Sequence, residues 1–368
     1  MTAQILAIAT AHPTHQADLA FSTHCAQSMS CEDETQANKL AKLYRRTGVD
    51  TRGSVLVEKG DAGELTQSFY PPLVDGDDRG PTMETRNDRF AAEAPALATQ
   101  AGQRAIDASG VKPSEITHVV TVTCTGFNAP GIDVQLIERL NLPVTTQRVQ
   151  VGFMGCHGLI NAMRTARGLV AVEPEAVVLI VCIELCSLHY QYGYDAQRIV
   201  SGSLFADGSA GLIVAGAESS NRDGHSDPIG EILTVGSCLI PDSQDAMTWR
   251  IGDNGFIMTL EASVPGFIEA NLRGFMEPWL AKAGLTLDQI GGWAVHPGGV
   301  RILQSVEVAL GLEPDALDIS REVLREHGNM SSATLGFVLQ KFTQRRVPGP
   351  WLMLGFGPGL EIEVAVVR

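Results

Sequence analysis

A cysteine in a glycine-containing turn is the strongest chemical signal in the sequence. Residues 150–158 read Gln-Val-Gly-Phe-Met-Gly-Cys-His-Gly, and Cys156 lies between a short strand pattern and an amphipathic run. Gly155 and Gly158 permit a tight turn and the close approach of a substrate. A thiol at the start of a helix meets the positive end of the helix dipole and free backbone N–H groups, which favour the reactive thiolate. Cys156 is therefore a candidate nucleophile, although a buried and inert cysteine fits the same local pattern.

Two polar residues further along the chain form a chemically sensible set with this thiol. His296 ends an apolar stretch and precedes Pro-Gly-Gly, so we expect it at the C-terminal edge of a strand, where open α/β sheets have their active sites. Asn329 lies in a polar turn before another helix. An imidazole can pair with a thiolate and then donate to an oxyanion, and a carboxamide adds a second neutral donor. Each residue alone also fits a structural role, as a packed histidine or a turn asparagine.

The elements that position these residues follow an α/β pattern, in which short apolar β-branched runs alternate with helical periodicity. Strands are expected at 4–9, 118–125, 177–184, 211–215, 232–240, 292–295, 351–356 and 362–367. Helices are expected at 89–109, 130–140, 157–172, 265–283, 299–310 and 320–327. A chain of 368 residues exceeds one ordinary core, so we expect two halves of similar size, separated by the irregular segment 217–227. The irregular segment 57–85 is expected to be a functional or surface insertion.

Composition restricts the partners and the compartment. The formal net charge of −15 would repel phosphate backbones, so nucleic acid is not an expected partner. No apolar run is long enough to span a bilayer, and the first residues lack the basic region of a signal peptide. The seven cysteines are odd in number, which favours free thiols in a reducing cytoplasm over a disulfide framework. No CxxC or HExxH motif occurs, so we expect no metal site.

Four ordered motifs resemble the signatures of type III polyketide synthases, the chalcone synthase-like family. They are Gly-Cys at 155–156, Val-His-Pro-Gly-Gly at 295–299, Gly-Asn-Met-Ser-Ser at 328–332 and Gly-Phe-Gly-Pro-Gly at 355–359. The last motif is the most diagnostic, because related ketosynthases lack it. The 140-residue step from Cys156 to His296 and the 33-residue step to Asn329 are similar to the family spacing. The resemblance covers essentially the whole chain, and the lead-in to Cys156 and the 57–85 insertion look like those of bacterial members.

The resemblance implies a thiolase-like αβαβα sandwich built from two related halves, at 1–220 and 228–368, and a homodimer. It also implies that Cys156 accepts a starter acyl group from its CoA ester. His296 and Asn329 would then stabilise the enolate that forms when malonyl-CoA loses CO2. The extended chain would cyclise in the same cavity to a pyrone, resorcinol or other phenolic product. The implied partners are thus an acyl-CoA starter and malonyl-CoA, and no cofactor is needed.

The resemblance assigns further residues around this reaction. Phe205 corresponds to the family's gatekeeper between CoA tunnel and cavity, and the second gatekeeper position holds the more flexible Met258. Positions that line the cavity are Cys124, Thr125, Cys186 and His189. Lys39, Lys42 and Arg46 lie on one face of an expected helix and coincide with family positions that contact CoA. Ordinary core packing and a solvated helix face also fit these residues.

His189 departs from the plant-type pattern, in which this position is small or carries a hydroxyl group. We therefore expect a starter other than p-coumaroyl-CoA, either a fatty or a small acyl group. Three other readings remain open: a β-ketoacyl synthase III-like enzyme that condenses once, a papain-like Cys-His-Asn hydrolase, and a catalytically silent scaffold. Product length, peptide cleavage and CoA release after Cys156→Ala separate these readings from one another.

Overall fold

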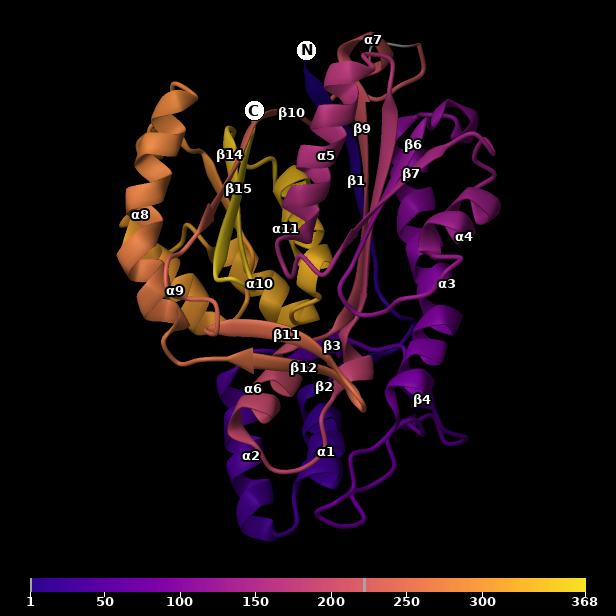
Figure 1. Cartoon of the computed structure of the whole chain (residues 1–368), viewed down its shortest axis with the longest axis vertical. Coiled ribbons are helices and arrows are strands. Elements are labelled where there is room, and N and C mark those ends of the chain that lie inside the picture. Colours follow the sequence, from indigo (N-terminus) through magenta and orange to yellow (C-terminus); the bar gives the residue numbers. More distant parts are fainter. Residues whose placement is uncertain (1, 221–222) are drawn as a thin grey trace.

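The computed structural model describes residues 2–220 and 223–368, and a mixed sheet of nine strands forms its centre. The strand order is β13-β14-β15-β10-β1-β9-β8-β6-β7. Strands β1 and β10 pair only through Gln4 with Glu231 and Ile5 with Gly230, so the sheet consists of two parts joined by a short seam (Figure 1). The α/β class predicted from the alternating sequence pattern is confirmed. Residues 221 and 222, inside the expected boundary segment 217–227, lie outside the described residues.

The two parts of the sheet have the same internal order. The N-terminal part contains β1 (Ala3–Ala11), β6 (His118–Thr123), β7 (Gln147–Gly152), β8 (Val177–Leu185) and β9 (Asp207–Gly216). The C-terminal part contains β10 (Gly230–Leu239), β13 (Gly292–Val295), β14 (Trp351–Gly357) and β15 (Glu361–Val367). In each part the first strand pairs antiparallel with the last, the last antiparallel with the penultimate, and the penultimate parallel with the second. This repeated pairing is the structural signature of two related halves.

Helices cover both parts of the sheet and fill the space between them (Figure 1). The helices are α1 (Leu19–Ser30), α2 (Glu34–Arg46), α3 (Met83–Ser109), α4 (Ile132–Arg139), α5 (Gly158–Val172), α6 (Ala196–Leu204), α7 (Ala217–Ser220), α8 (Val264–Lys282), α9 (Val300–Leu310), α10 (Asp318–His327) and α11 (Thr334–Arg345). Helices α3 and α4 lie outside the N-terminal part, and α8 and α9 lie outside the C-terminal part. Helices α5 and α11 lie between the two parts, which completes five αβαβα layers.

The remaining elements are short. Two-stranded ribbons are formed by β2 (Gln16–Asp18) with β3 (Thr51–Gly53), β4 (Glu58–Lys59) with β5 (Leu65–Thr66), and β11 (Met247–Gly252) with β12 (Gly255–Leu260). Four 3-10 turns are η1 (Pro113–Glu115), η2 (Cys186–His189), η3 (Leu287–Gln289) and η4 (Ser331–Ala333). The ribbon of β11 and β12, which the sequence pattern did not predict, lies below the central helices and above α6 (Figure 1).

The burial pattern explains why the sequence forms these layers. All nine residues of β8, Val-Val-Leu-Ile-Val-Cys-Ile-Glu-Leu, are buried, as expected for a strand covered by helices on both faces. Helix α5 buries Leu159, Ile160, Met163 and Ala166 in the core between the two halves. The strands and helices in the inner layers therefore have nearly continuous apolar sequences.

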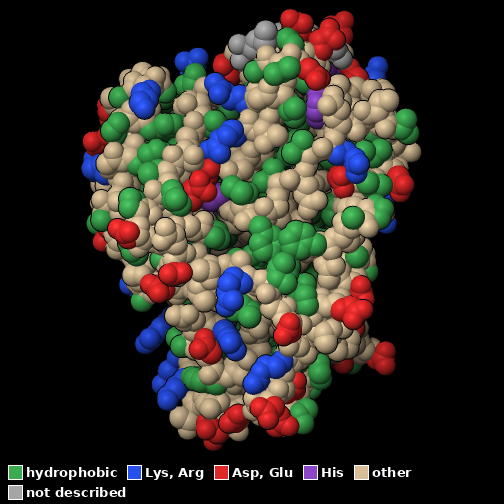
Figure 2. Space-filling model, in the orientation of Figure 1, with side chains coloured by type: hydrophobic (Ala, Val, Ile, Leu, Met, Phe, Trp, Pro, Cys, Tyr) green, Lys and Arg blue, Asp and Glu red, His purple; other side chains and the backbone are tan. Residues whose placement is uncertain are grey.

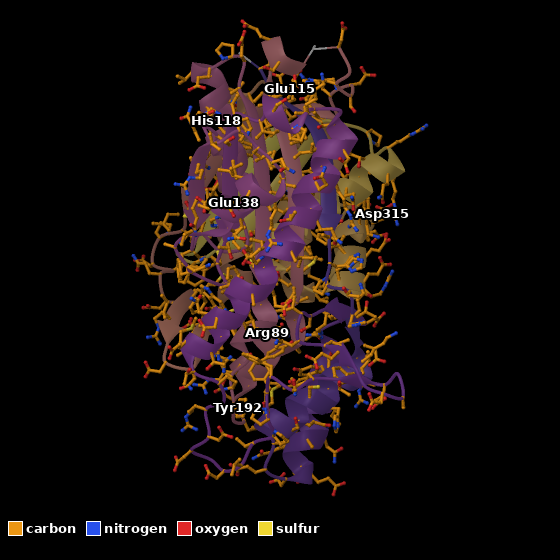
Figure 3. All side chains as sticks on the ribbon, turned by 90° about the vertical axis from the view of Figure 1, so that its right-hand side faces the viewer. Arg89, Glu115, His118, Glu138, Tyr192 and Asp315 are labelled. Atoms are coloured by element: carbon orange, nitrogen blue, oxygen red, sulfur yellow. The ribbon has the colours of Figure 1, made fainter. Side chains whose placement is uncertain are left out.

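The outer helix α3 begins earlier than predicted. It starts at Met83 rather than at residue 89, because the side chain of Thr82 accepts a hydrogen bond from the backbone N–H of Thr85 and caps the helix. The helix ends at Ser109, and the next residue, Gly110, adopts a left-handed conformation with φ of 70° that caps it. Figure 3 shows this outer side of the molecule, with Arg89 of α3 low in the view and Glu138 of α4 near its middle.

The repeated topology gives the two halves equivalent loops before their penultimate strands. Helix α5 precedes β8 in the first half, and helix α11 precedes β14 in the second. Cys156 lies just before α5, and Asn329 lies just before the turn η4 that leads into α11. Because α5 and α11 share the central layer, their preceding loops meet at one end of it (Figure 1). Residues separated by more than 170 positions are thereby placed at one site.

Candidate active site

The turn that carries Cys156 depends on glycine at position 155. Between the end of β7 and the start of α5, Phe153 has φ of 58° and Gly155 has φ of 83°. A Cβ atom added at Gly155 would lie 2.5 Å from Cδ of Pro358, in the loop between β14 and β15. Only glycine combines the left-handed conformation with this close approach. The glycine-rich motif near the C-terminus therefore packs directly against the loop of the candidate nucleophile.

The thiol of Cys156 is surrounded by neutral hydrogen-bonding groups. Side chains of Ser331 and Asn329 hydrogen-bond to it, and both contacts lower its pKa. Burial acts in the opposite direction and is the largest effect, and the charge of Glu184 adds to it, so the pKa of Cys156 is raised to about 12. The helix terminus was expected to favour the thiolate, and in the free protein the loss of hydration on burial outweighs the contacts that lower the pKa. Cys156 is present as the thiol at neutral pH.

Asn329 is held by its backbone and its side chain. Its N–H donates to the carbonyl of Leu204 at 2.8 Å, and its carbonyl accepts from the N–H of Ala206 at 2.9 Å, which places it beside Phe205. Its Oδ1 accepts from the N–H of Ser331 at 2.8 Å. Because Oδ1 is engaged in this way, the amide Nδ2 remains as the donor for the thiol of Cys156.

His296 follows β13, at the strand end predicted for it. Its backbone N–H donates to the carbonyl of Leu354 at 2.7 Å, and its side chain is 1% exposed. Neither ring nitrogen has a hydrogen-bond partner among the described residues. Burial, and then His157, lower the pKa of His296 to about 3, so the ring is neutral at neutral pH. Such an imidazole has one donor and one acceptor free for a substrate.

A cavity adjoins the thiol of Cys156. It has a volume of about 30 Å³, and its wall includes residues that the sequence analysis assigned to the cavity and to its gate. These residues are Cys124, Thr125, Cys186, Phe205 and Met258. The wall also contains Met247, Thr248 and Trp249 of β11, none of which was singled out from the sequence. Pairing with β12 brings Trp249 opposite Met258. The sequence analysis did not predict this ribbon, so it could not place Trp249 in the wall.

His189 lines a second space of about 30 Å³, which shares Cys186, Phe205, Trp249 and Met258 with the first. Its Nε2 lies 2.8 Å from the carbonyl of Thr125, and its Nδ1 accepts from the N–H of Phe256 at 3.1 Å. The ring also stacks on Phe256, with centroids 4.1 Å apart. Both nitrogens are therefore engaged, and burial lowers the pKa of His189 to about 3. His189 supports the wall and has no nitrogen free for proton transfer.

Trp249 is one of the four residues that line both spaces. Its indole Nε1 donates to the backbone carbonyl of Cys124 at 2.8 Å. This hydrogen bond fixes the largest side chain of the wall beside the nucleophile. Trp249 therefore occupies part of the space beside Cys156.

Glu184 is a buried carboxylate that the sequence analysis did not single out as a site residue. Oε1 accepts from the hydroxyl of Ser332, and Oε2 accepts from the N–H of Cys124 at 2.9 Å and the hydroxyl of Thr125 at 2.8 Å. Burial is the largest effect on its pKa, which is raised to about 7 despite these donors. Its ionisation therefore changes the charge near Cys156 in the neutral pH range.

Glu184→Gln is expected to lower the pKa of Cys156, because the carboxylate charge raises it. More thiolate is then present at any pH below that pKa, and each unit of decrease means about tenfold more. The alkylation rate of Cys156 by iodoacetamide, measured from pH 6 to 10 with mass-spectrometric site assignment, tests this. Glu138→Gln, an exposed position on α4, is the matched control (Figure 3). An unchanged pH profile in Glu184→Gln would contradict the assignment.

A larger groove of about 390 Å³ lies next to the gate region. It is lined by Arg46 of α2, by Leu204 before Phe205, and by Gly298, Gly299 and Arg301 around the start of α9. A helix N-terminus and two arginines suit a phosphorylated ligand. Lys39 and Lys42 are exposed on the same helix as Arg46 but are not part of the groove wall. Figure 2 shows basic side chains gathered in the lower half of this face, near α2 and α6.

Arg301 was missed by the sequence analysis. The signal available was a basic residue two positions after Gly-Gly in the motif at 295–299, at the start of an expected helix.

None of the helices within 2–220 and 223–368 has the length and apolar character needed to cross a membrane.

Models of known families match nearly the whole chain. The N-terminal domain of chalcone and stilbene synthases matches residues 1–219, and their C-terminal domain matches residues 231–368. A polyketide synthase-like protein of alpha-pyrone synthesis from Mycobacterium tuberculosis is 31% identical over 337 residues, which cover 90% of this chain and 82% of that protein. A probable polyketide synthase of Dictyostelium discoideum is 34% identical over 288 residues, or 77% of this chain. The match spans only 9% of that much longer relative.

Solved structures show the same fold. The C-terminal type III polyketide synthase domain of Steely1, a type I/III hybrid from Dictyostelium, superposes with a TM-score of 0.89 and 27% identity, covering 100% of this chain and 99% of that one. A synthase from the brown alga Ectocarpus siliculosus has a TM-score of 0.90 and 28% identity, covering 100% and 98%. The thiolase-like sandwich predicted from the four motifs is confirmed.

Proposed function

Because the chain belongs to the chalcone and stilbene synthase family and is a type III polyketide synthase, we propose that Cys156 carries the growing acyl chain. In this proposal a starter acyl group moves from its CoA ester to Cys156, and malonyl-CoA then extends it by decarboxylative Claisen condensation. The observation that carries the proposal is the contact of the Cys156 thiol with the side chains of Asn329 and Ser331. His296, whose two ring nitrogens are buried and unpartnered among the described residues, interacts electrostatically with His157, the residue after Cys156.

The protonation states suggest an order for the proposed steps. Cys156 is a thiol and His296 is a neutral imidazole in the free protein. During loading, the imidazole accepts the thiol proton while sulfur attacks the thioester carbonyl, and CoA leaves as its thiol once it takes up a proton. During extension, the neutral donors of His296 and Asn329 hydrogen-bond to the enolate oxygen formed as CO2 departs. Loss of CO2 supplies the carbanion, so the proposal includes no cofactor beyond the CoA thioesters.

The test is product analysis by mass spectrometry with purified protein, malonyl-CoA and a panel of starter CoAs. Cyclised pyrones or phenolics that contain several malonyl-derived units support the proposal. A single uncyclised extension would favour the β-ketoacyl synthase reading, and no product with any starter would count against the proposed site.

We propose a small or medium-sized starter, because Trp249 limits the space beside Cys156. Trp249→Gly is expected to join the two spaces and to raise turnover of a long-chain acyl-CoA relative to acetyl-CoA by about tenfold, in the range that differences of a few methylene groups in a pocket produce. Competition between the two CoA esters in one assay measures this ratio. Trp249→Phe, which keeps most of the bulk, should leave the ratio near that of the wild type. An unchanged ratio of long-chain to acetyl-CoA turnover in Trp249→Gly would contradict the proposed size limit.

The CoA moiety is proposed to bind in the groove lined by Arg46 and Arg301. Arg46→Ala and Arg301→Ala are each expected to raise KM for acyl-CoA about tenfold, with a smaller effect at high salt, since each loses a charge-assisted contact to phosphate. Lys39→Ala and Lys42→Ala serve as matched controls on α2 and test the wider basic face proposed from sequence. A KM that rises only in the lysine variants would move the phosphate site along α2 and away from the groove.

The proposal also includes a homodimer and a cytosolic location. It divides the chain into halves at 1–220 and 228–368. Strand β7 is one of the two edge strands of the nine-stranded sheet, and Phe127, which is 41% exposed, stacks on Phe153 beside the end of β7. Figure 2 shows a hydrophobic patch near the middle of the face that it draws. An open edge beside exposed aromatic side chains supports pairing with a second copy. All seven cysteines are free thiols, which supports a reducing compartment.

A further inference from the structure

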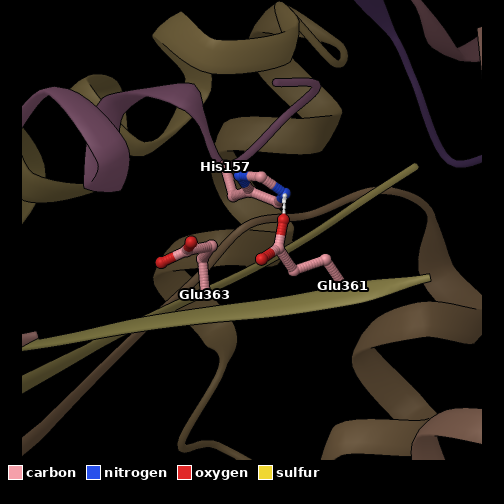
Figure 4. Close-up of side chains that lie close together, drawn as sticks. All are labelled: His157, Glu361 and Glu363. Atoms are coloured by element: carbon pink, nitrogen blue, oxygen red, sulfur yellow. Dashed lines mark ion pairs between the residues drawn. The ribbon is translucent and has the colours of Figure 1, made fainter. Parts of the chain in front are cut away.

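The residue after the nucleophile, His157, is completely buried and faces two carboxylates of β15 (Figure 4). One ligand atom from each of His157, Glu361 and Glu363 lies within 4.8 Å of the other two. Nε2 of His157 is 3.5 Å from Oε2 of Glu361, and it has no hydrogen-bond partner among the described residues. A buried polar atom of this kind needs an explanation.

The tautomer of His157 follows from its other nitrogen. Asn161 uses its amide Nδ2 to donate to Oε1 of Glu363 at 2.9 Å, so its Oδ1 is the atom that faces Nδ1 of His157 at 2.7 Å. Oδ1 can only accept a hydrogen bond, and Nδ1 must therefore carry the hydrogen. A neutral His157 then directs the lone pair of Nε2 toward Glu361.

A lone pair and a carboxylate oxygen at 3.5 Å repel each other unless a proton lies between them. The charge of Glu363 is balanced by Arg164, which contacts both of its oxygens. Glu361, by contrast, has its pKa raised by burial and then by the charge of Glu363, so it holds a proton more readily than an exposed glutamate. Burial lowers the pKa of His157 to about 4, so the proton resides on Glu361 rather than on the imidazole. Since Glu363 is already engaged, only two groups are free for a metal ion, fewer than the three or four protein ligands of a zinc site.

The ring of His157 also fills space that two glycines leave open. A Cβ atom at Gly357 would lie 2.4 Å from Nε2 of His157, and one at Gly355 would lie 2.9 Å from its Cβ. These glycines belong to the Gly-Phe-Gly-Pro-Gly motif, and Pro358 of the same motif packs against Gly155. The motif therefore contacts the chain on both sides of Cys156.

We propose that a proton held by Glu361 faces Nε2 of His157 (the shared proton) and that this pair is a positioning device for Cys156, holding its turn against the loop between β14 and β15. His157 is not part of the cavity wall and acts through its neighbours in the chain. The inference rests on the proposed function for the role of Cys156, while the proton sharing itself is independent of that role.

The groups that face this pair determine its response to pH. They are Glu361 and Glu363 from β15, Asn161 and Arg164 from α5, and His296 after β13, whose pKa His157 lowers. As the pH rises, the pair loses its shared proton and the lone pair then faces a carboxylate. The contact that holds the Cys156 turn then weakens. We therefore expect a plot of kcat against pH to show a fall that the plot of KM against pH does not show.

Glu361→Gln is the sharpest test, because a glutamine amide donates to Nε2 at every pH. Its kcat at neutral pH should stay within about threefold of the wild type, while the high-pH step disappears. His157→Ala should lower kcat by about 10- to 100-fold with KM for the acyl-CoA unchanged, as for other groups that orient a reactive residue. Glu231→Gln, on β10, is the matched control and should keep the step.

Two readouts do not depend on turnover. Nitrogen NMR of labelled histidine should show a hydrogen on Nδ1 of His157 and a titrating Nε2 that becomes pH-independent in Glu361→Gln. The iodoacetamide reactivity of Cys156 should show the same step in the wild type, and it should lose that step in the variant. The proposal is overturned if Glu361→Gln keeps the wild-type pH step, or if zinc or a chelator changes the NMR signal of His157. Absence of polyketide products with an intact NMR titration would reject the proposed function and leave the shared proton standing.

Discussion

Cys156→Ala is expected to abolish polyketide formation, with a loss of at least about a thousandfold, because covalent catalysis cannot proceed without its nucleophile. The most direct measurement is the intact mass of the protein after incubation with a starter CoA. The wild type should gain the mass of one acyl group on the peptide that contains Cys156, and Cys156→Ala should gain none.

The cavity provides an internal control for this experiment. Cys186 lines the same space as Cys156, is buried, and has its pKa raised well above the usual value by burial and by nearby charges that include Glu184. Cys186→Ala should therefore retain acylation at Cys156. Acylation that persists in Cys156→Ala, or CoA release at the wild-type rate, would revive the reading of the chain as a scaffold or move the nucleophile to another thiol.

His296→Ala and Asn329→Ala are each expected to slow decarboxylation of malonyl-CoA by about 10²- to 10³-fold, the range for loss of one donor to a developing oxyanion. Conversion of malonyl-CoA to acetyl-CoA in the absence of a starter measures this step alone. Asn329→Ala should still accept a starter on Cys156, because the amide is proposed to act on the enolate. His296→Gln retains a neutral donor and should recover part of the lost rate.

The pH dependence of decarboxylation gives a second check on His296. Burial and His157 lower its pKa to about 3, so its ring stays neutral as the pH rises from about 5 to 8. No step from His296 is expected in this range, whereas a histidine of ordinary pKa would lose a proton near pH 6.5. The exposed His12 offers a control, since His12→Ala should change neither the rate nor its pH profile. Equal rates in the wild type and in His296→Ala would remove this residue from the proposed mechanism.

The local sequence determined much of this protein. Alternating apolar and helical patterns predicted most strands and helices, because each buried element must present apolar side chains at the period of its own backbone. Gly155, the Pro-Gly-Gly after His296 and the turn at Asn329 marked the ends of elements, where side chains are free of the main packing. The resemblance to one family then rested on the order and spacing of these local signals.

Only the tertiary structure decided how the site behaves. The pKa of Cys156 depends on burial and on Glu184, and the free nitrogens of His296 depend on every neighbour that could have paired with them. The position of Trp249 follows from the register of a ribbon that the sequence pattern did not predict. The proximity of His157 to Glu361 joins residues more than 200 positions apart. Propensity and spacing are local properties of a chain, whereas hydration, charge and the volume of a cavity depend on which distant segments pack together.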